Sequence, residues 1–155
     1  MVRDVLMGAT PPRALRTVRY LVIGMAGGLV AFGFDDLVTR HLEDVVVVLD
    51  AIGLSLFAVT GAALAVTAGM NRLTAILLGT ITAVGGGTLR DVVLNQVPEV
   101  LVGNIYAVAA AAGAAVYVYA VRSRRSQTAA MIVGAAVCFG LRMGSVWLDW
   151  QLPVA

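Results

Sequence analysis

Five apolar runs, each about as long as a membrane-spanning helix, constrain this chain more than any other feature. A helix needs about 20 mostly apolar residues to cross a bilayer. The runs occupy residues 20–37, 45–68, 73–94, 100–121 and 128–148. Apolar residues make up 60% of the chain and charged residues only 13%, so too few polar side chains remain to coat a water-facing surface. The pattern predicts an all-α, polytopic transmembrane helical bundle.

Arginines in the connections predict which loops face the cytoplasm, because basic residues collect on that side of membrane proteins. The connections with basic residues contain Arg13, Arg16 and Arg19 before the first run, Arg72 before the third, and Arg122, Arg124 and Arg125 before the last. The other two loops are acidic or neutral and are expected outside. The segment before the first run has no secretory signal. We therefore expect a multi-pass protein of the cytoplasmic membrane that is targeted by its first helix.

Several classes of function are excluded by what the sequence lacks. The eleven basic residues are all arginine and form no basic stripe interleaved with aromatics, which argues against a nucleic-acid partner. His41 is the only histidine and has no second ligand at the spacing of a metal site. The sequence contains no catalytic triad or phosphate-binding loop. We therefore expect no enzyme activity, no metal and no cofactor, and we interpret Cys138, which lies in an apolar run, as a small core residue.

An internal repeat predicts the architecture. Arg3-Asp4-Val5-Leu6 is followed by Pro11, and 87 positions later Arg90-Asp91-Val92-Val93 is followed by Pro98 at the same spacing. The second copy contains the runs that begin at positions 45, 73 and 100, so one repeat has three helices. An odd number of spans inverts consecutive copies, and permeation proteins with inverted repeats place the solute path at the repeat interface. We predict inverted three-helix repeats plus one extra C-terminal helix.

The repeat divides the chain into three expected parts. Residues 1–37 are a remnant of the first repeat, comprising the end of its second helix and its third helix; residues 45–121 are the complete second repeat; residues 128–149 are the extra helix. The alignment places Met1 opposite Thr88, so the first copy has no counterpart of residues 50–87. We expect that the start is misplaced, the alternative being a truncated chain that takes its missing helices from another subunit.

Three consecutive glycines, Gly85, Gly86 and Gly87, lie within the third run. Glycines remove side-chain packing and favour unwinding or a kink, and broken membrane helices survive only where they line a cavity or the protein interior. Exposed carbonyls there, with the hydroxyls of Thr82 and Thr88, would suit a partly dehydrated cation or a zwitterion. Close helix packing around a bend is the alternative interpretation.

Charged residues inside the runs predict a polar vestibule, because lipid exposure of a charge costs several kcal/mol. Arg90 and Asp91 lie inside the third run near its end, and Asp50 lies inside the second near its start, at a depth that antiparallel helices would match. We predict an ion pair between Asp50 and Arg90. Arg142 has no charge within six residues and is expected to point into the bundle or to snorkel, with Asp91 as a possible partner.

Small residues in the runs predict close packing between helices, and aromatic residues near the ends of the runs predict anchors at the membrane interface. Residues 107–115 and Gly134 are small, which lets helices approach closely in lipid. Tyr117, Tyr119 and Trp147 lie near the ends of runs, where aromatic side chains act as interfacial anchors.

Two segments resemble one family of small bacterial membrane proteins. They are Asp50-Ala-Ile-Gly-Leu-Ser-Leu-Phe-Ala-Val-Thr-Gly-Ala62, and Thr82-Ala-Val-Gly-Gly-Gly-Thr-Leu-Arg-Asp-Val-Val-Leu94 followed by Pro98. The family is described both as glycine-transporter-domain proteins and as bacterial relatives of the trimeric intracellular cation (TRIC) channels. The resemblance implies a seven-helix protomer that assembles as a homotrimer with a pore through each protomer. It also implies that Gly85, Gly86 and Gly87 form a hinge, that Arg90 and Asp91 lie at its end, and that Arg3 and Asp4 are their first-repeat equivalents.

These observations together predict a permeation protein in the lipid bilayer. The permeant is a small monovalent cation, potassium-like by the channel resemblance, or glycine by the transporter resemblance. The alternative is a non-conducting membrane scaffold or assembly subunit, because the first helix and most of the second of the expected first repeat are missing.

Overall fold

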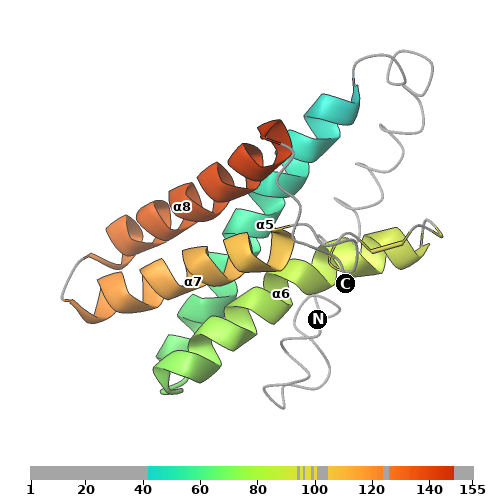
Figure 1. Cartoon of the computed structure of the whole chain (residues 1–155). Coiled ribbons are helices and arrows are strands. Elements are labelled where there is room, and N and C mark those ends of the chain that lie inside the picture. The colour runs from blue at the N-terminus through green and yellow to red at the C-terminus, as the bar shows by residue number, and fades with distance from the viewer. Residues whose placement is uncertain are drawn as a thin grey trace, which may run out of the picture. The chain divides into compact units, whose positions relative to one another are not determined.

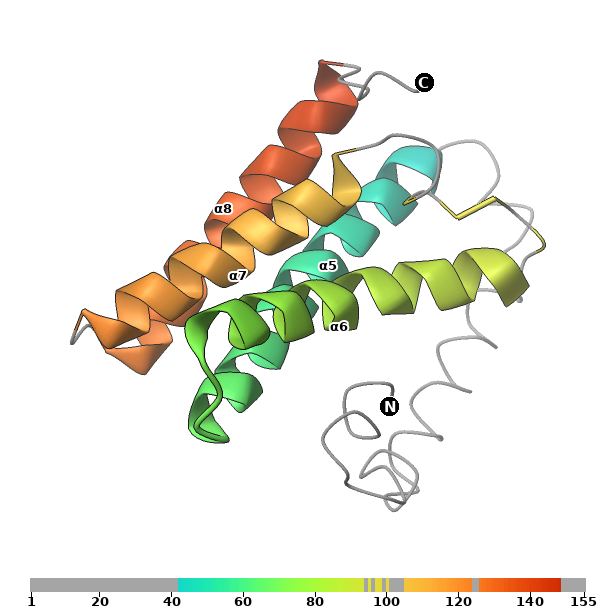
Figure 2. The same cartoon turned by 60° about the horizontal axis from the view of Figure 1, so that its bottom comes forward.

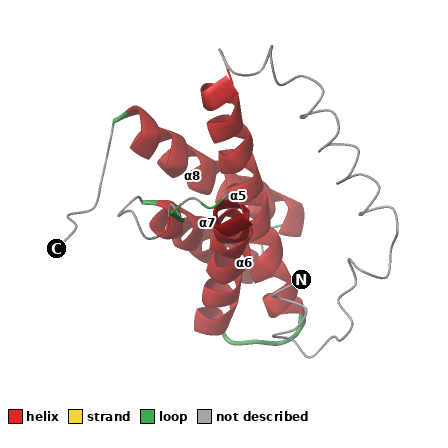
Figure 3. Cartoon of the chain, turned by 90° about the vertical axis from the view of Figure 1, so that its right-hand side faces the viewer, coloured by secondary structure: helices red, strands yellow, loops and turns green. Residues whose placement is uncertain are grey.

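The computed structural model describes residues 42–93, 95, 97, 98, 100, 105–123 and 126–148, and these form four α-helices (Figure 1). The helices are α5 (Leu42–Thr67), α6 (Arg72–Val93), α7 (Tyr106–Arg122) and α8 (Gln127–Trp147). Figure 3 shows only helices and loops in this part of the chain. Packing divides the chain into compact units Met1–Val47 and Val48–Ala155, and every contact below lies within the second. The predicted span at 20–37, with the rest of the first-repeat remnant, lies outside the described residues.

The prediction of an all-helical membrane bundle is confirmed. Among the residues that the structure describes, three helices are long and apolar enough to cross a membrane, over Val45–Thr67, Arg72–Val92 and Gln127–Trp147. Helix α7 has 17 residues, at the short end of the range for a spanning helix. The helix begins at Tyr106, six residues after the start of the predicted span at Val100.

Short connections make consecutive helices antiparallel. Four residues join α5 to α6 and four join α7 to α8. Figures 1 and 2 show the antiparallel course of each pair. In the first turn Gly69 has a φ of +76°, a conformation that glycine adopts without strain, and Met70 N–H donates to Ala65 O at 3.0 Å. Asn71 Oδ1 then accepts from Thr74 N–H at 2.8 Å and caps the start of α6.

Helices α7 and α8 pack through one small-residue face each. The buried positions recur three or four residues apart, as expected for one helical face: Tyr106, Ala109, Ala110, Gly113, Ala114, Tyr117 and Val118 on α7, and Ala130, Gly134, Cys138, Arg142 and Ser145 on α8. A Cβ placed on Gly113 would lie 2.5 Å from Cys138 Cβ and 2.8 Å from Gly134 O. The close packing expected of the small residues is therefore present, and Cys138 is a fully buried core residue as predicted.

Helices α5 and α6 cross at a second pair of glycines. A Cβ on Gly79 would lie 2.6 Å from Ala58 O and 3.0 Å from the Cβ atoms of Ala62 and Ala114, and one on Gly61 would lie 2.9 Å from Thr82. Backbone atoms cannot yield as a flexible side chain can, so the approach depends on glycine. We call Gly61, Gly79, Gly113 and Gly134 the glycine crossings.

One of the predicted interfacial anchors is misassigned. Tyr117 is 1% exposed, because Gly134 on α8 leaves room for it: a Cβ there would lie 3.1 Å from Tyr117 Cβ. Tyr119, two residues later and therefore on another face of α7, is 55% exposed, and Trp147 is 81% exposed. Both have the exposure that an anchor requires.

Candidate functional site

The predicted ion pair between Asp50 and Arg90 is present in the structure. Arg90 Nη1 donates to Asp50 Oδ1 at 2.9 Å, which joins α6 to α5 across 40 positions of sequence. The pair forms because α5 and α6 run antiparallel, which brings Asp50 in the N-terminal part of α5 to Arg90 in the C-terminal part of α6. The Arg90 side chain is 38% exposed and the Asp50 side chain 13%.

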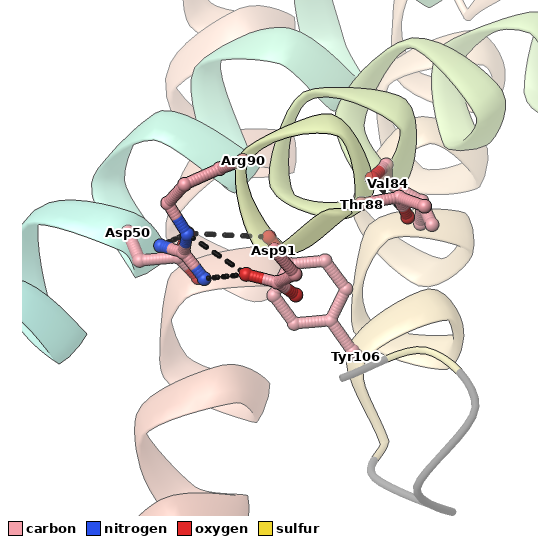
Figure 4. A network of polar contacts seen from close by, with 6 residues as sticks. All are labelled: Asp50, Val84, Thr88, Arg90, Asp91 and Tyr106. Atoms are coloured by element: carbon pink, nitrogen blue, oxygen red, sulfur yellow. Dashed lines mark hydrogen bonds and ion pairs between the residues drawn. The ribbon is translucent and has the colours of Figure 1, made fainter. Parts of the chain in front are cut away.

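Arg90 is shared between two carboxylates. Its Nε and Nη2 atoms both donate to Asp91 Oδ1 at 2.9 Å, and the Asp91 side chain is only 5% exposed (Figure 4). The guanidinium fork offers five N–H groups in one plane, which allows it to serve both acids at once. The more exposed arginine therefore covers two more deeply buried carboxylates.

Tyr106, the first residue of α7, adds a third helix to this group. Its hydroxyl donates to Asp50 Oδ1 at 3.3 Å, so one carboxylate oxygen accepts from both Arg90 and Tyr106. Figure 4 shows the ring beside Asp91 and Arg90. Tyr106 is 3% exposed, and a buried hydroxyl needs such a partner because burial without one costs free energy.

Arg142 brings in α8. Its guanidinium carbon lies 4.7 Å from the centre of the Tyr106 ring, a cation–π arrangement, and the residue is 4% exposed. The prediction that it points into the bundle is confirmed, while a direct contact with Asp91 stays a prediction. We call Asp50, Arg90, Asp91, Tyr106 and Arg142 the charge cluster, which formally carries two positive and two negative charges.

The glycine triplet is not unwound in this structure. Helix α6 runs without interruption from Arg72 to Val93, so the expected exposed carbonyls are absent from this conformation. The three glycines also differ. A Cβ would meet nothing within 4 Å at Gly85 and only Phe57 at 3.8 Å at Gly86, but at Gly87 it would lie 2.5 Å from the Tyr106 hydroxyl. Gly87 therefore makes room for Tyr106, whereas Gly85 and Gly86 are free to bend or to take a side chain.

Both predicted threonines bond within their own helix. Thr82 Oγ1 donates to Leu78 O at 2.6 Å and Thr88 Oγ1 to Val84 O at 3.0 Å. Thr82 lies against Gly61 at the α5–α6 crossing, and Figure 4 shows Thr88 directed away from the carboxylates. Their hydroxyl oxygens can still accept hydrogen bonds or contact a cation, since each hydroxyl has two lone pairs.

The structure thus brings together four of the predicted residues, Asp50, Arg90, Asp91 and Arg142, and leaves the threonines and two of the glycines apart from them. Arg3 and Asp4 lie outside the described residues. Among the residues that the structure describes, no group of three or more His, Cys, Asp or Glu side chains could hold a metal ion.

Sequence reasoning missed Tyr106, which joins the cluster. A signal was available: Tyr106 and Tyr117 are eleven positions apart in an otherwise small-residue run, which places both on one helical face. A buried face of small residues leaves space for a large ring at each end. The partner of each ring is not encoded locally, because it lies on other helices.

The charge cluster combines acidic and basic side chains, and its four charged members lie in helices that are long and apolar enough to cross a membrane. Charges within membrane helices face a partner or an aqueous cavity, and here each charge lies against another side chain while Arg90 stays partly exposed. Such an arrangement can offer a wetted wall to a small polar or charged solute without a large net charge.

Comparison with known proteins identifies relatives along the whole chain. The profile of the family described as "Glycine transporter" matches residues 47–122. A UPF0126 membrane protein of Deinococcus radiodurans is 43% identical over 73% of this chain, and the match covers 53% of that protein. One of Vibrio cholerae is 30% identical over 98% of this chain and covers 64% of its own length. The UPF0126 inner membrane protein YadS of Escherichia coli (strain K12) is 30% identical over 98% of this chain and 74% of its own length.

Solved structures of cation channels share the fold. A TRIC cation channel studied for its conductance matches with a TM-score of 0.89 at 34% identity, over 99% of this chain and 75% of the channel. The TRIC trimeric intracellular cation channel orthologue from Rhodobacter sphaeroides matches with a TM-score of 0.89 at 32% identity, over 96% and 76%. The chain spans only about half to two thirds of the Deinococcus and Vibrio relatives. These names describe membrane proteins and channels, in agreement with the expectation that the chain is not an enzyme.

Proposed function

Because this chain belongs to the UPF0126 family of bacterial multi-pass membrane proteins, we propose that it contributes a passive path for small monovalent cations across the cell membrane. The observation that carries this proposal is its likeness to cation channels, with TM-scores of 0.88 to 0.89 at 32% to 34% identity. Potassium is the first cation to test.

The charge cluster supports this proposal as a candidate vestibule. A conduction path needs polar groups that hold water and ions weakly, so that ions can enter and leave. Asp50 and Asp91 supply carboxylate oxygens, and the nearby arginines offset their charge, which prevents tight trapping of a cation. Arg90, with 38% of its side chain exposed, is the member through which the cluster reaches an aqueous space.

The glycine triplet has the properties of a hinge for this path. Among the described residues, a Cβ on Gly85 would meet nothing within 4 Å and one on Gly86 only Phe57 at 3.8 Å, so packing within this part of the chain does not require glycine at either position. Three glycines in sequence lower the cost of bending α6. We propose that bending here moves Thr88, Arg90 and Asp91 relative to α5.

Glycine is the second candidate permeant. The matching profile carries the description "Glycine transporter". The cluster also holds both signs of charge within one site, which complements the ammonium and carboxylate groups of a zwitterion. A transporter of this kind would need an occluded site and two alternating states.

Flux measurements in liposomes test these candidates. The 155-residue chain would be reconstituted beside the E. coli relative YadS, as a longer member of the family, and assayed for potassium flux and for labelled-glycine uptake. Potassium flux that does not saturate at low concentration would support the channel, and saturable glycine uptake would support the transporter. If the relative conducts and this chain carries neither solute, the chain is a scaffold or assembly subunit and the permeation proposal is wrong.

Substitution of the cluster tests its role in the path. We expect Asp50→Asn and Arg90→Gln to lower flux by about tenfold or more, because a change of 1.4 kcal/mol in a barrier alters a rate tenfold. Thr74→Val is the matched control, since it removes a polar group from the exposed start of α6, far from the cluster. Equal flux in all three variants would remove the cluster from the path.

We also propose that the chain acts as a homotrimer. The Rhodobacter structure is described as a trimeric channel, and its likeness to this chain supports the same assembly. Mass measurement of the detergent-solubilised protein, after subtraction of bound detergent, should give three copies, and a stable monomer that conducts would contradict this assignment.

A further inference from the structure

A second polar group lies at the opposite end of the described helices, where α5 ends, α6 begins and α7 ends. Arg122 Nη2, on the last residue of α7, donates to Met70 O in the α5–α6 turn at 3.3 Å. The guanidinium of Arg72, the first residue of α6, lies 5.6 Å from the centre of the Tyr119 ring of α7. The two arginines thus come from different helices, one from the start of α6 and one from the end of α7, and these two helix ends lie at the same end of the described helices (Figures 1 and 2).

The arginines at this end of the described helices have no acidic residue near them in the sequence. The sequence has no Asp or Glu between Asp50 and Asp91, or between Glu99 and Asp149, whereas Arg72 and Arg122 lie in those intervals and Arg124 and Arg125 follow. Asp50 and Asp91 belong to the charge cluster at the other ends of α5 and α6. The two arginines have only a ring face and a backbone carbonyl as described partners, both of which leave guanidinium N–H groups for an anion.

The surroundings of these arginines are those of a membrane interface. Arg72 and Arg122 are exposed, as is the Tyr119 ring at 55%. Leu73 and Leu77, one turn apart on α6, are 68% and 51% exposed. A soluble anion would make no use of such apolar surface, but a lipid would place its phosphate on the arginines and its acyl chains along the leucines.

We propose that Arg72 and Arg122 bind the phosphate of an anionic phospholipid headgroup, and that Tyr119 and the Met70 carbonyl position them for it. A guanidinium forms paired hydrogen bonds with phosphate oxygens, and its stacking on a ring fixes the plane of the fork. Arginine placement puts this end on the cytoplasmic side, where the leaflet carries anionic lipid. The site lies on α6 and α7 away from the charge cluster, so it does not depend on the permeation path.

Lipid competition on the intact protein tests the proposal. The purified chain would be delipidated in mild detergent, supplied with equal amounts of phosphatidylglycerol and phosphatidylcholine, and examined by native mass spectrometry for the ratio of the two lipids retained. We expect the ratio to favour phosphatidylglycerol and to fall about fivefold for each of Arg72→Gln and Arg122→Gln. Tyr119→Leu keeps both charges and should lower the ratio about twofold through loss of the stacked geometry.

A control variant, the arginine variants and competition with inorganic phosphate decide whether the lipid proposal stands. Thr128→Val changes an exposed residue at the same end, on α8, and should leave the lipid ratio unchanged. If the double variant Arg72→Gln/Arg122→Gln does not fold, the single variants provide the test. An unchanged ratio in the single arginine variants would overturn the proposal. Displacement of phosphatidylglycerol from the wild-type chain by inorganic phosphate at low millimolar concentration would also overturn it, because the site would then bind free phosphate.

Discussion

At the glycine crossings, α5 meets α6 and α7 meets α8 through backbone and methyl contacts. At the charge cluster, by contrast, Asp50, Arg90, Tyr106 and Arg142 join the four described helices. The first region contains no charged side chain and depends on the absence of a Cβ. The second depends on a balance of charge in which one arginine serves two acids. Membrane helices gain little from apolar burial alone, since lipid is equally apolar, so close approach and polar contact are the remaining means of association.

The glycines show the same contrast within one residue type. A Cβ at Gly79 would collide with the backbone of α5, and one at Gly87 with the Tyr106 hydroxyl, while one at Gly85 would meet nothing within 4 Å. Glycines at the crossings therefore allow close helix packing. The contacts among the described residues do not explain glycine at positions 85 and 86, and we propose that these two residues allow α6 to bend. Four sets of substitutions test whether this division of the molecule holds.

Removal of the shared arginine should have the largest effect on stability. Arg90→Gln takes the guanidinium from both Asp50 and Asp91. Loss of one partner of a buried charge pair costs about 3–5 kcal/mol, and because the Arg90 side chain is 38% exposed we expect a loss no larger than the lower end of that range. Asp50→Asn should cost less, because Arg90 keeps Asp91. Unfolding midpoints in detergent provide the measurement, and a larger loss for Asp50→Asn would show that the arginine is not the centre of the cluster.

A methyl group at a crossing should have the next largest effect. Gly79→Ala places its Cβ 2.6 Å from Ala58 O, and overpacking of this kind costs about 1–3 kcal/mol before the gain in helix propensity is counted. We expect a net loss of stability in thermal unfolding of the detergent-solubilised protein. Gly53→Ala, on α5 with nothing within 4 Å of its added Cβ, is the matched control and should be neutral or stabilising.

Gly87 is a tightly packed glycine that contacts Tyr106 of the charge cluster, so substitutions at these two positions should be coupled. Gly87→Ala should destabilise the protein, and Tyr106→Phe should cost about 1 kcal/mol through loss of the hydrogen bond to Asp50. In combination they should cost less than their sum, because the hydroxyl that meets the added Cβ is gone. Strictly additive losses in a double-mutant cycle would mean that the two residues do not contact each other in the membrane.

The smallest effect on stability is expected at Gly85. Gly85→Ala should stabilise α6 by up to about 1 kcal/mol, since alanine is the better helix former and the position is open. If the triplet is a hinge, the same variant should slow flux in liposomes despite its higher unfolding midpoint. A Gly85→Ala protein with unchanged flux would leave Gly85 without a role in bending.

The positions of three of the described helices could be read from the sequence because hydrocarbon thickness and backbone hydrogen bonding impose a fixed length on each membrane helix. The runs at 45–68, 73–94 and 128–148 differ from α5, α6 and α8 by a few residues at their ends. The Asp50–Arg90 pair was also predictable, since two opposite charges at equal depth on antiparallel helices have few other partners.

Other features were decided only by the tertiary structure. Tyr117 is buried and Tyr119 exposed although they are two positions apart, and Gly87 packs tightly although Gly85 does not. The sequence by itself determined which segments enter the membrane and which charges must find partners there, because these depend on the solvent that surrounds each helix. The rotation of each helix, and with it the place of Tyr106 between Asp50 and Arg142, followed from how the four helices fit against one another.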